Sequence, residues 1–410
     1  MSLSPLSRRA VVGAALSGAV VAATAGPAGA ASRPAPALAS TPSSGGGPAR
    51  RSPSVPATVP VPPLNVPALR AALADLEHPE LTAAQLRVSG SAGRWCGTEG
   101  VADRATGRAV HERDTFRIGS ITKVFVATVV LQLVAEHRLS PEQPVQRLLP
   151  GLLPSGFPPI TVAQLLNHTS GLPDEQDPPY DPSSPEDVAR HRYDRWTPGQ
   201  LVARVSHGPM KFTPGTKQEY RGINYVLLAL LIERLTGCHY GEAIAHRILR
   251  PLDLRHTAVP GNDPRIHWPH VHGYMRMTDG SLLDITKFDQ SAAWGEGEMI
   301  SRTGDLERFL TALFSGELLP RHELERMFTL PPDEVRMVDG TPARYAAGLQ
   351  TFTLNGITLW GKTGERYGYS SAMFGTRDQQ RRVVFSFNPT RRDAGQAQVS
   401  QRIAEALTKA

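Results

Sequence analysis

The chain has 410 residues, of which 40% are hydrophobic and 20% charged, a composition typical of a globular protein with a packed core. The formal net charge is +6, but the basic residues are dispersed, with no run of five lysines or arginines. The sequence therefore argues against nucleic-acid binding. Two cysteines, Cys96 and Cys238, are too few for a disulfide scaffold, and their spacing leaves open whether they are bonded.

The first 30 residues have the pattern of an export signal. Arg8 and Arg9 precede an Ala/Val/Gly-rich run, and residues 28–30 (Ala-Gly-Ala) fit a small-residue cleavage site. The paired arginines favour the twin-arginine route, although the general secretory route stays open. The apolar run is too short and too rich in Gly and Ala for a stable membrane span. We therefore predict a signal over residues 1–30 and a secreted protein, extracellular or associated with the cell wall.

Residues 31–63 are dominated by Pro, Ser, Ala and Gly and contain almost no bulky apolar side chain. Such a segment cannot bury enough apolar surface to offset the entropy of ordering it. We expect a disordered linker here and a folded part that begins near residue 64.

The folded part begins with a mixture of helix and strand. Apolar residues at helical spacing predict a helix over 64–77, and apolar runs around a Ser/Gly turn predict strands at 86–88 and 94–102. A long helix follows over about 120–137. It is apolar on nearly all sides, which is typical of a buried central helix.

The middle of the chain, about 140–284, is helical and rich in loops. The last third returns to strands, where Asn355-Gly356 between two apolar runs is a strong hairpin signal. The sequence therefore predicts an α+β fold with an antiparallel sheet flanked by helices, built from about 64–139 and 285–410. The helical middle is expected to form an inserted all-α domain.

Ser120 and Lys123 are the first candidate catalytic residues. Helical geometry places positions i and i+3 on one face, so the Lys123 amine can reach the Ser120 hydroxyl. A serine hydroxyl becomes a nucleophile only when a neighbouring base takes its proton, and a lysine can be that base only if its pKa is lowered. Taken alone, S-x-x-K also describes a helix cap followed by a lysine that reaches solvent. Here the lysine opens an apolar helix, where an idle charge would be costly.

Lys362-Thr363-Gly364 follows the second hairpin strand and is the second element of a known set of catalytic motifs. Lys362 is expected to add a positive charge that helps to keep Lys123 neutral. Thr363 is expected to hydrogen-bond the substrate. The backbone N–H of Glu365 would join that of Ser120 in an oxyanion hole.

Several short segments occur in a characteristic order along the chain. They are F-R-I-G-S-I-T-K (116–123), L-N-H-T-S-G-L (166–172), P-G-T (214–216), Tyr220 and I-E-R-L-T-G (232–237), followed by K-T-G (362–364). Together they resemble the serine beta-lactamase and D-alanyl-D-alanine peptidase superfamily, in particular its class C beta-lactamase and Streptomyces-type carboxypeptidase branch.

The resemblance implies a beta-lactamase/DD-peptidase fold with the active site between its two parts, and hydrolysis through an acyl-enzyme on Ser120. Tyr220 would carry protons beside Lys123. It further implies a monomeric carboxypeptidase that needs no metal or cofactor, acts on peptidoglycan stem peptides or another small acyl substrate, and is inhibited by beta-lactams. A beta-lactamase or esterase on the same scaffold is the alternative.

The sequence departs from the family pattern at two positions of the expected site. Gly222 stands where the family has an asparagine that contacts the substrate amide and the first lysine; Asn224 is a potential substitute. Glu365 places a negative charge after K-T-G, and Arg366 could offset that charge. We expect Thr363, Gly364 and Arg366 to bind the substrate. These departures leave room for an esterase or amidase acting on a substrate without a free carboxylate, or for a non-catalytic relative.

His267, His270 and His272 have a spacing that metal sites can show, but Pro269 interrupts them and no acidic or cysteine set accompanies them. We expect a loop before a strand rather than a metal site. His168 lies in the family's H-T-S-G-L segment, where the resemblance implies a structural role.

Overall fold

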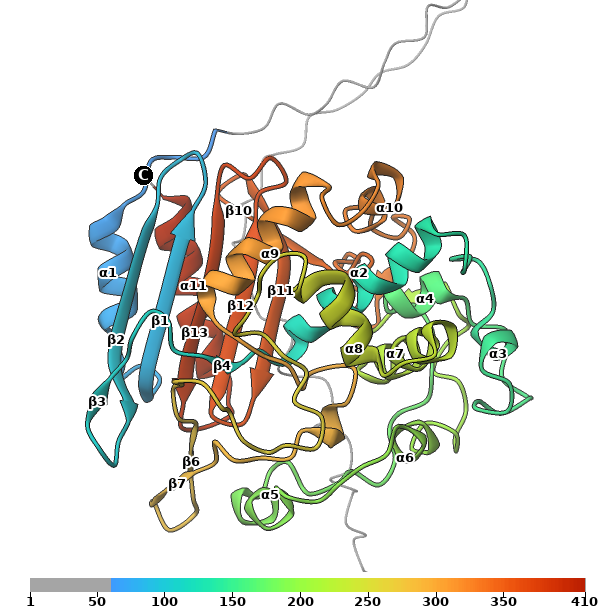
Figure 1. Ribbon diagram of the computed structural model, residues 1–410, viewed down its shortest axis with the longest axis horizontal. Coiled ribbons are helices and arrows are strands. Elements are labelled where there is room, and N and C mark those ends of the chain that lie inside the picture. Colours follow the sequence, from blue (N-terminus) through green and yellow to red (C-terminus); the bar gives the residue numbers. More distant parts are fainter. Residues whose placement is uncertain (1–59, 410) are drawn as a thin grey trace, which may run out of the picture.

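The computed structural model describes residues 60–409, and its centre is a seven-stranded sheet in the order β10-β11-β12-β13-β1-β2-β3 (Figure 1). Neighbouring strands pair antiparallel throughout. Because β13 pairs with β1, the first and the last strand of the described chain lie side by side within the sheet. The strands are β1 (Leu81–Ser89), β2 (Trp95–Asp103), β3 (Arg108–Ala109), β10 (Gln350–Leu354), β11 (Ile357–Arg366), β12 (Tyr369–Gly375) and β13 (Arg382–Pro389).

The predicted hairpin is confirmed between β10 and β11, where Leu354 pairs with Ile357. Asn355 and Gly356 have φ values of 50° and 77°. A two-residue turn of this type needs positive φ at both positions, which Asn and Gly tolerate better than other residues. The hairpin fixes the register of β11, the strand that carries the K-T-G motif.

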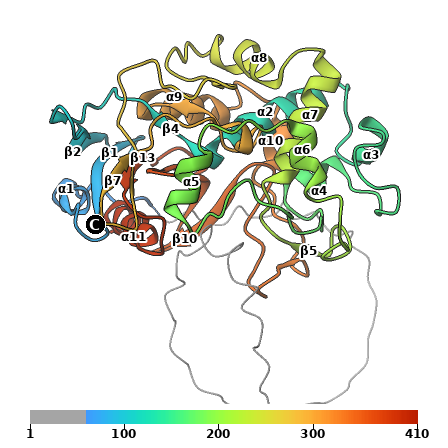
Figure 2. The ribbon, with the colours of Figure 1, turned by 90° about the horizontal axis from the view of Figure 1, so that it is seen from below.

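Helices cover both faces of the sheet (Figure 2). Helices α1 (Val66–Ala74) and α11 (Gly395–Thr408) lie against one face, where Leu69 and Ile403 belong to one buried apolar cluster with sheet residues. Helix α9 (Thr303–Ser315) contacts β1, β12 and β13 on the other face. Helices therefore pack on both faces of the sheet, while strands β2 and β3 at one edge stay partly exposed, and the predicted α+β class is confirmed.

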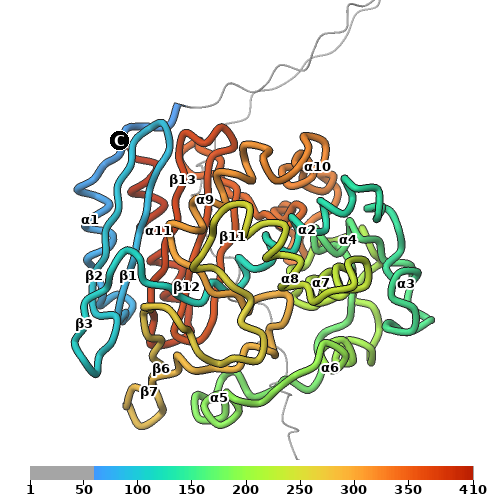
Figure 3. Tube along the Cα trace, in the orientation of Figure 1, coloured from blue at the N-terminus to red at the C-terminus, as the bar shows by residue number. Residues whose placement is uncertain are grey.

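Helix α2 (Thr122–Ala135) runs through the interior and packs on α7 (Ile223–Thr236), which ends at Gly237 in the left-handed conformation (Figure 3). The remaining helices and helical turns are η1 (Gly119–Ile121), α3 (Val145–Leu148), α4 (Val162–Leu166), α5 (Pro185–His191), α6 (Pro198–Ala203), α8 (Tyr240–Ile244), η2 (Ala245–Leu249), η3 (Ser291–Ala293) and α10 (Arg321–Arg326). Short strands pair as β4 (Phe116–Arg117) with β8 (Ile300–Ser301), β5 (Lys217–Gln218) with β9 (Arg336–Met337), and β6 (Tyr274–Arg276) with β7 (Leu282–Asp284).

The long helix expected over 120–137 is shorter and begins differently. A 3-10 turn over residues 119–121 precedes α2, because Gly119 has a φ of 50° that a regular helix does not allow. Cys96 and Cys238 are both free thiols. Within residues 60–409, no helix combines the length and apolarity needed to cross a membrane. The predicted export signal and nearly all of the predicted linker lie outside the described residues.

Candidate active site

Ser120 lies in the turn between β4 and α2, directly against strand β11. A Cβ added to Gly119 would lie 2.3 Å from the backbone nitrogen of Glu365, and one added to Gly364 would lie 1.9 Å from the carbonyl oxygen of Ile118. Only glycine permits this approach at the two positions. This contact brings the backbone of Ser120 close to the backbone of Glu365. These are the two residues predicted to form the oxyanion hole.

The Ser120 hydroxyl is held by the two side chains expected to activate it. Lys123 Nζ lies 3.1 Å from Ser120 Oγ, and the Tyr220 hydroxyl lies 2.7 Å from the same atom. The Lys123 side chain is fully buried at the start of α2. The i, i+3 geometry expected from the sequence is thus present, and Tyr220 joins it from a segment 100 residues away.

Tyr220 is fixed by an aromatic cluster and stays protonated. Its ring centroid is 4.6 Å from that of His168 and 5.2 Å from that of Tyr345. Burial, together with the charge of Glu296, raises the pKa of Tyr220 far above its usual 10. The phenol is therefore a hydrogen-bond donor that can pass a proton on, rather than a standing tyrosinate base. His168 has a structural place here, because the backbone N–H of Arg221 donates to its Nδ1 at 3.2 Å.

Lys362 lies over the ring of Tyr220, with Nζ 4.5 Å from the ring centroid. Its Nζ donates to Oε1 of Gln350 at 3.0 Å, and the Thr363 hydroxyl donates to the same oxygen at 3.4 Å. Burial, and then the charge of Lys123, lower the pKa of Lys362 well below its usual value.

Burial lowers the pKa of Lys123 as well, and the charge of Glu296 opposes that shift. Glu296 Oε2 forms an ion pair with Lys123 Nζ at 2.7 Å. That a charged Lys362 helps to keep Lys123 neutral stays a prediction.

Glu365 is neutralised by a different arginine than expected. Its Oε1 lies 2.6 Å from Nε of Arg392, in a partly exposed ion pair. Successive side chains of a strand point to opposite faces, so Arg366, the next residue of β11, is turned away from Glu365. Arg366 instead lies near Lys123 and Glu296, and its charge lowers the pKa of both. Its buried Nε has no hydrogen-bond partner within residues 60–409.

Glu296 is a site residue that the sequence analysis missed. Its Oε2 lies 2.7 Å from Lys123 Nζ, and its backbone oxygen lies 2.8 Å from the same nitrogen. A Cβ added to Gly222 would lie 2.1 Å from that Oε2. The carboxylate therefore occupies the space of a side chain at position 222, and it makes the contact with the first lysine that the family's asparagine makes.

Asn224 does not replace that asparagine, contrary to the alternative drawn from the sequence. It is fully buried and accepts a hydrogen bond from the Ser170 hydroxyl at 2.7 Å. Its amide nitrogen lies 3.2 Å from Nδ1 of His168. Two residues along a helix turn a side chain by about 200°, which points Asn224 into the interior.

A buried acid anchors the loop that carries Glu296. Tyr240 donates to Oε1 of Glu298, and the backbone N–H of Gly295 donates to the same oxygen at 3.2 Å. The backbone N–H of Met299 donates to the Thr122 hydroxyl at 3.2 Å. These bonds tie residues 295–299 to α8 and to the start of α2. The one feature of the sequence that could have drawn attention to this segment is G-E-G-E (295–298), in which a single glycine separates two acidic residues.

The histidines with metal-like spacing do not form a metal site. His267 pairs with Asp263 at 2.7 Å and His272 with Asp284 at 2.7 Å, each on its own. Among the described residues no group of three or more His, Cys, Asp or Glu is placed to hold a metal ion.

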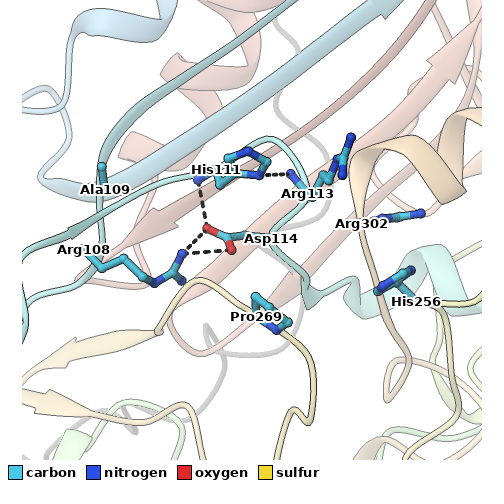
Figure 4. A pocket seen from close by; sticks show the side chains of 8 residues that line it. All are labelled: Arg108, Ala109, His111, Arg113, Asp114, His256, Pro269 and Arg302. Atoms are coloured by element: carbon cyan, nitrogen blue, oxygen red, sulfur yellow. Dashed lines mark hydrogen bonds and ion pairs between the residues drawn. The ribbon is translucent and has the colours of Figure 1, made fainter.

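A groove of about 630 Å³ lies elsewhere, beside β3 and the start of β4 (Figure 4). Arg108 and Asp114, which line it, form an ion pair at 2.9 Å, and Arg302 is paired with Asp305 at 2.8 Å. The lining shares no residue with the Ser120 cluster. We assign this groove no role in the chemistry of Ser120.

The sheet with an inserted helical part and the Ser120, Lys123 and Tyr220 cluster define a serine hydrolase. The chain belongs to the Beta-lactamase family, whose family model matches residues 69–408. The resemblance found in the sequence is confirmed at this level.

Relatives within this family have several names. A D-stereospecific amidohydrolase from Streptomyces sp. is 36% identical in a structural alignment with a TM-score of 0.73, which covers 83% of this chain and 98% of that one. Esterase EstB of Burkholderia gladioli is 32% identical over 195 residues, 44% of this chain and 49% of the relative. Penicillin-binding protein 4* of Bacillus subtilis is 26% identical over 303 residues, 70% of this chain. The chain spans about half of the esterase and 64% of the penicillin-binding protein.

Proposed function

We propose that the chain is an exported serine hydrolase that cleaves amide and ester bonds of small D-amino-acid derivatives through an acyl-enzyme on Ser120. The observation that carries this proposal is the double hydrogen bond from Lys123 and Tyr220 to the Ser120 hydroxyl. The D-configuration is supported by the similarity to the D-stereospecific amidohydrolase from Streptomyces sp..

The contacts support a reaction in two halves. In acylation, Ser120 Oγ bonds to the substrate carbonyl carbon while its proton passes to a neutral Lys123 amine. The backbone N–H groups of Ser120 and Glu365 would stabilise the oxyanion that forms. As the intermediate collapses, the carbon–nitrogen or carbon–oxygen bond breaks, and the leaving group takes a proton relayed through Tyr220. Water then attacks the ester, gives its proton to the same groups, and releases the acid and Ser120.

A D-alanyl-D-alanine carboxypeptidase is the second candidate, and Arg366 favours it. The guanidinium lies close enough to Lys123 to lower its pKa, and its buried Nε has no partner among residues 60–409. A cation in this place suits a leaving group that ends in a free carboxylate, as a stem peptide of peptidoglycan does. Beta-lactams, which carry an equivalent carboxylate, would then acylate Ser120.

Hydrolysis of paired enantiomers tests the proposal. D-phenylalanine amide, L-phenylalanine amide and diacetyl-L-lysyl-D-alanyl-D-alanine are incubated with the chain and with Ser120→Ala, and the released amine is quantified. We expect the D-amide to be cleaved in preference to the L-amide, and activity to disappear in Ser120→Ala. Release of D-alanine as the fastest reaction would select the carboxypeptidase. Equal rates for wild type and Ser120→Ala would refute a serine hydrolase centred on Ser120.

A further inference from the structure

Glu296 puts a carboxylate on the side of Ser120 where the family pattern has an amide side chain. The family's asparagine carries an NH₂ group that can donate to a substrate carbonyl. An ionised carboxylate can only accept hydrogen bonds. The carbonyl of an N-acylated substrate would therefore face a second acceptor, whereas a cationic donor would find a partner.

We propose that Glu296 binds the α-ammonium group of the substrate's acyl residue. This selects D-amino-acid amides and esters with a free amino group over N-acylated peptides. The proposal rests on the proposed function, because it assigns the substrate class of the same Ser120 centre.

The distances place Glu296 within reach of that group. Its side chain is 27% exposed, so one part contacts Lys123 while another remains accessible. Lys123 Nζ is 2.7 Å from the carboxylate and 3.1 Å from Ser120 Oγ. Lys123 therefore links the Glu296 carboxylate to the nucleophile through two consecutive hydrogen bonds. In a D-amino-acid derivative, the α-nitrogen is two bonds from the carbonyl carbon that Ser120 attacks. An ammonium in that position comes close to the space above Gly222 that the carboxylate fills.

Glu296 can bind a substrate cation more readily than the neighbouring acids Glu365 and Glu175 can, because those two acids are paired with arginines. Glu365 is paired with Arg392 at 2.6 Å, and Glu175 lies 3.7 Å from Arg221. Arginine stays protonated, so these pairs persist throughout a reaction. Glu296 is paired with Lys123, the residue that must become neutral in order to act as a base.

A substrate ammonium would resolve the conflict between these two roles of Lys123. In the structure, Lys123 Nζ has three acceptors, namely Ser120 Oγ and two oxygens of Glu296, which suits an ammonium with three donors. When a substrate cation pairs with Glu296, Lys123 can release its proton to solvent water, and the carboxylate remains paired with a cation. The amine of Lys123 then accepts the Ser120 proton and is again a cation beside Glu296.

The test compares D-phenylalanine 4-nitroanilide with its N-acetyl derivative at pH 7, using the full-length chain. We expect wild type to favour the free amine, and Glu296→Gln to lose about 10- to 100-fold in kcat/KM on it, which is the loss expected for a charge-assisted hydrogen bond. Because Glu296 also contacts Lys123, the readout is the ratio of kcat/KM between the two substrates, which is expected to fall by that factor in Glu296→Gln, and an unchanged circular dichroism spectrum shows that the variant is folded. Glu175→Gln is the matched control, and its ratio between the two substrates is expected to stay that of wild type.

A wild-type preference for the N-acetyl substrate, or an unchanged preference in Glu296→Gln, would overturn the assignment while leaving the proposed function standing. Loss of the preference in Glu175→Gln instead would also overturn it. A wild-type chain that cleaves neither substrate would refute the proposed function, and this assignment with it.

Discussion

Glu298 should make the protein less stable as the pH rises through the slightly acidic range. The carboxyl group is fully enclosed, and burial raises its pKa from the usual 4.5 to about 7, although Tyr240 and Gly295 donate to it. Its Oε2 has no hydrogen-bond partner within residues 60–409, which suits an oxygen that carries the proton. Because the folded state holds this proton more tightly than the unfolded chain, the folded state loses stability as the pH rises from about 4.5 to 7. The difference of about 2.5 units corresponds to about 3 kcal/mol.

Glu298→Gln removes this ionisation and retains an oxygen for Tyr240 and Gly295. We expect the variant to unfold with a free energy about 3 kcal/mol higher than wild type at pH 8, and within about 1 kcal/mol of it at pH 4. Urea unfolding followed by circular dichroism at both pH values measures the difference. A stability difference that is the same at pH 4 and pH 8 would refute the reasoning.

Glu307→Gln provides a control of opposite sign. Burial alone would raise the pKa of Glu307, but the Ser89 hydroxyl and the contact with Arg87 together outweigh burial and lower the pKa. A lowered carboxyl pKa contributes stability above the unfolded value, and that stability is lost as the pH falls. This variant should therefore be less stable than wild type at pH 8, and the difference should shrink at pH 4.

Three further substitutions have expected outcomes. Lys123→Ala should reduce acylation of Ser120 by at least about 10³-fold with an unchanged circular dichroism spectrum, since it removes the base; acylation at the wild-type rate would contradict this. Tyr220→Phe should lower kcat about 10²- to 10⁴-fold by removing the hydroxyl 2.7 Å from Ser120 Oγ, and an unchanged kcat would exclude it from proton transfer. Gly364→Ala should cost about 1–3 kcal/mol, because its Cβ would lie 1.9 Å from the Ile118 carbonyl oxygen; an unchanged melting temperature would show that β11 can move.

The parts of the site that the sequence could predict are those encoded by short spacings. Ser120 and Lys123 are three residues apart, and helical geometry alone brings them together. The K-T-G strand follows a hairpin whose Asn355-Gly356 turn fixes its register. The positions of both segments could be predicted because local backbone rules determine them.

The parts that could not be predicted depend on contacts between distant segments. Glu296 lies 74 residues after Gly222 in the numbering, and only the folded loop shows that its carboxylate fills the space left by the missing side chain. The pairing of Glu365 with Arg392 depends likewise on where the chain returns after β13. The departures from the family pattern at Gly222 and Glu365 can be seen in the sequence. Only the tertiary structure shows that Glu296 fills the space at Gly222 and that Arg392 pairs with Glu365.

The central claim is that Ser120 is the nucleophile of a serine hydrolase, and covalent labelling tests it most directly. The full-length chain and Ser120→Ala are each treated with a fluorophosphonate, which reacts irreversibly with activated serines, and their intact masses are compared. The account predicts one adduct in wild type, located by peptide mapping on Ser120, and none in Ser120→Ala. An unmodified wild-type chain, or an adduct that persists in Ser120→Ala, would contradict it.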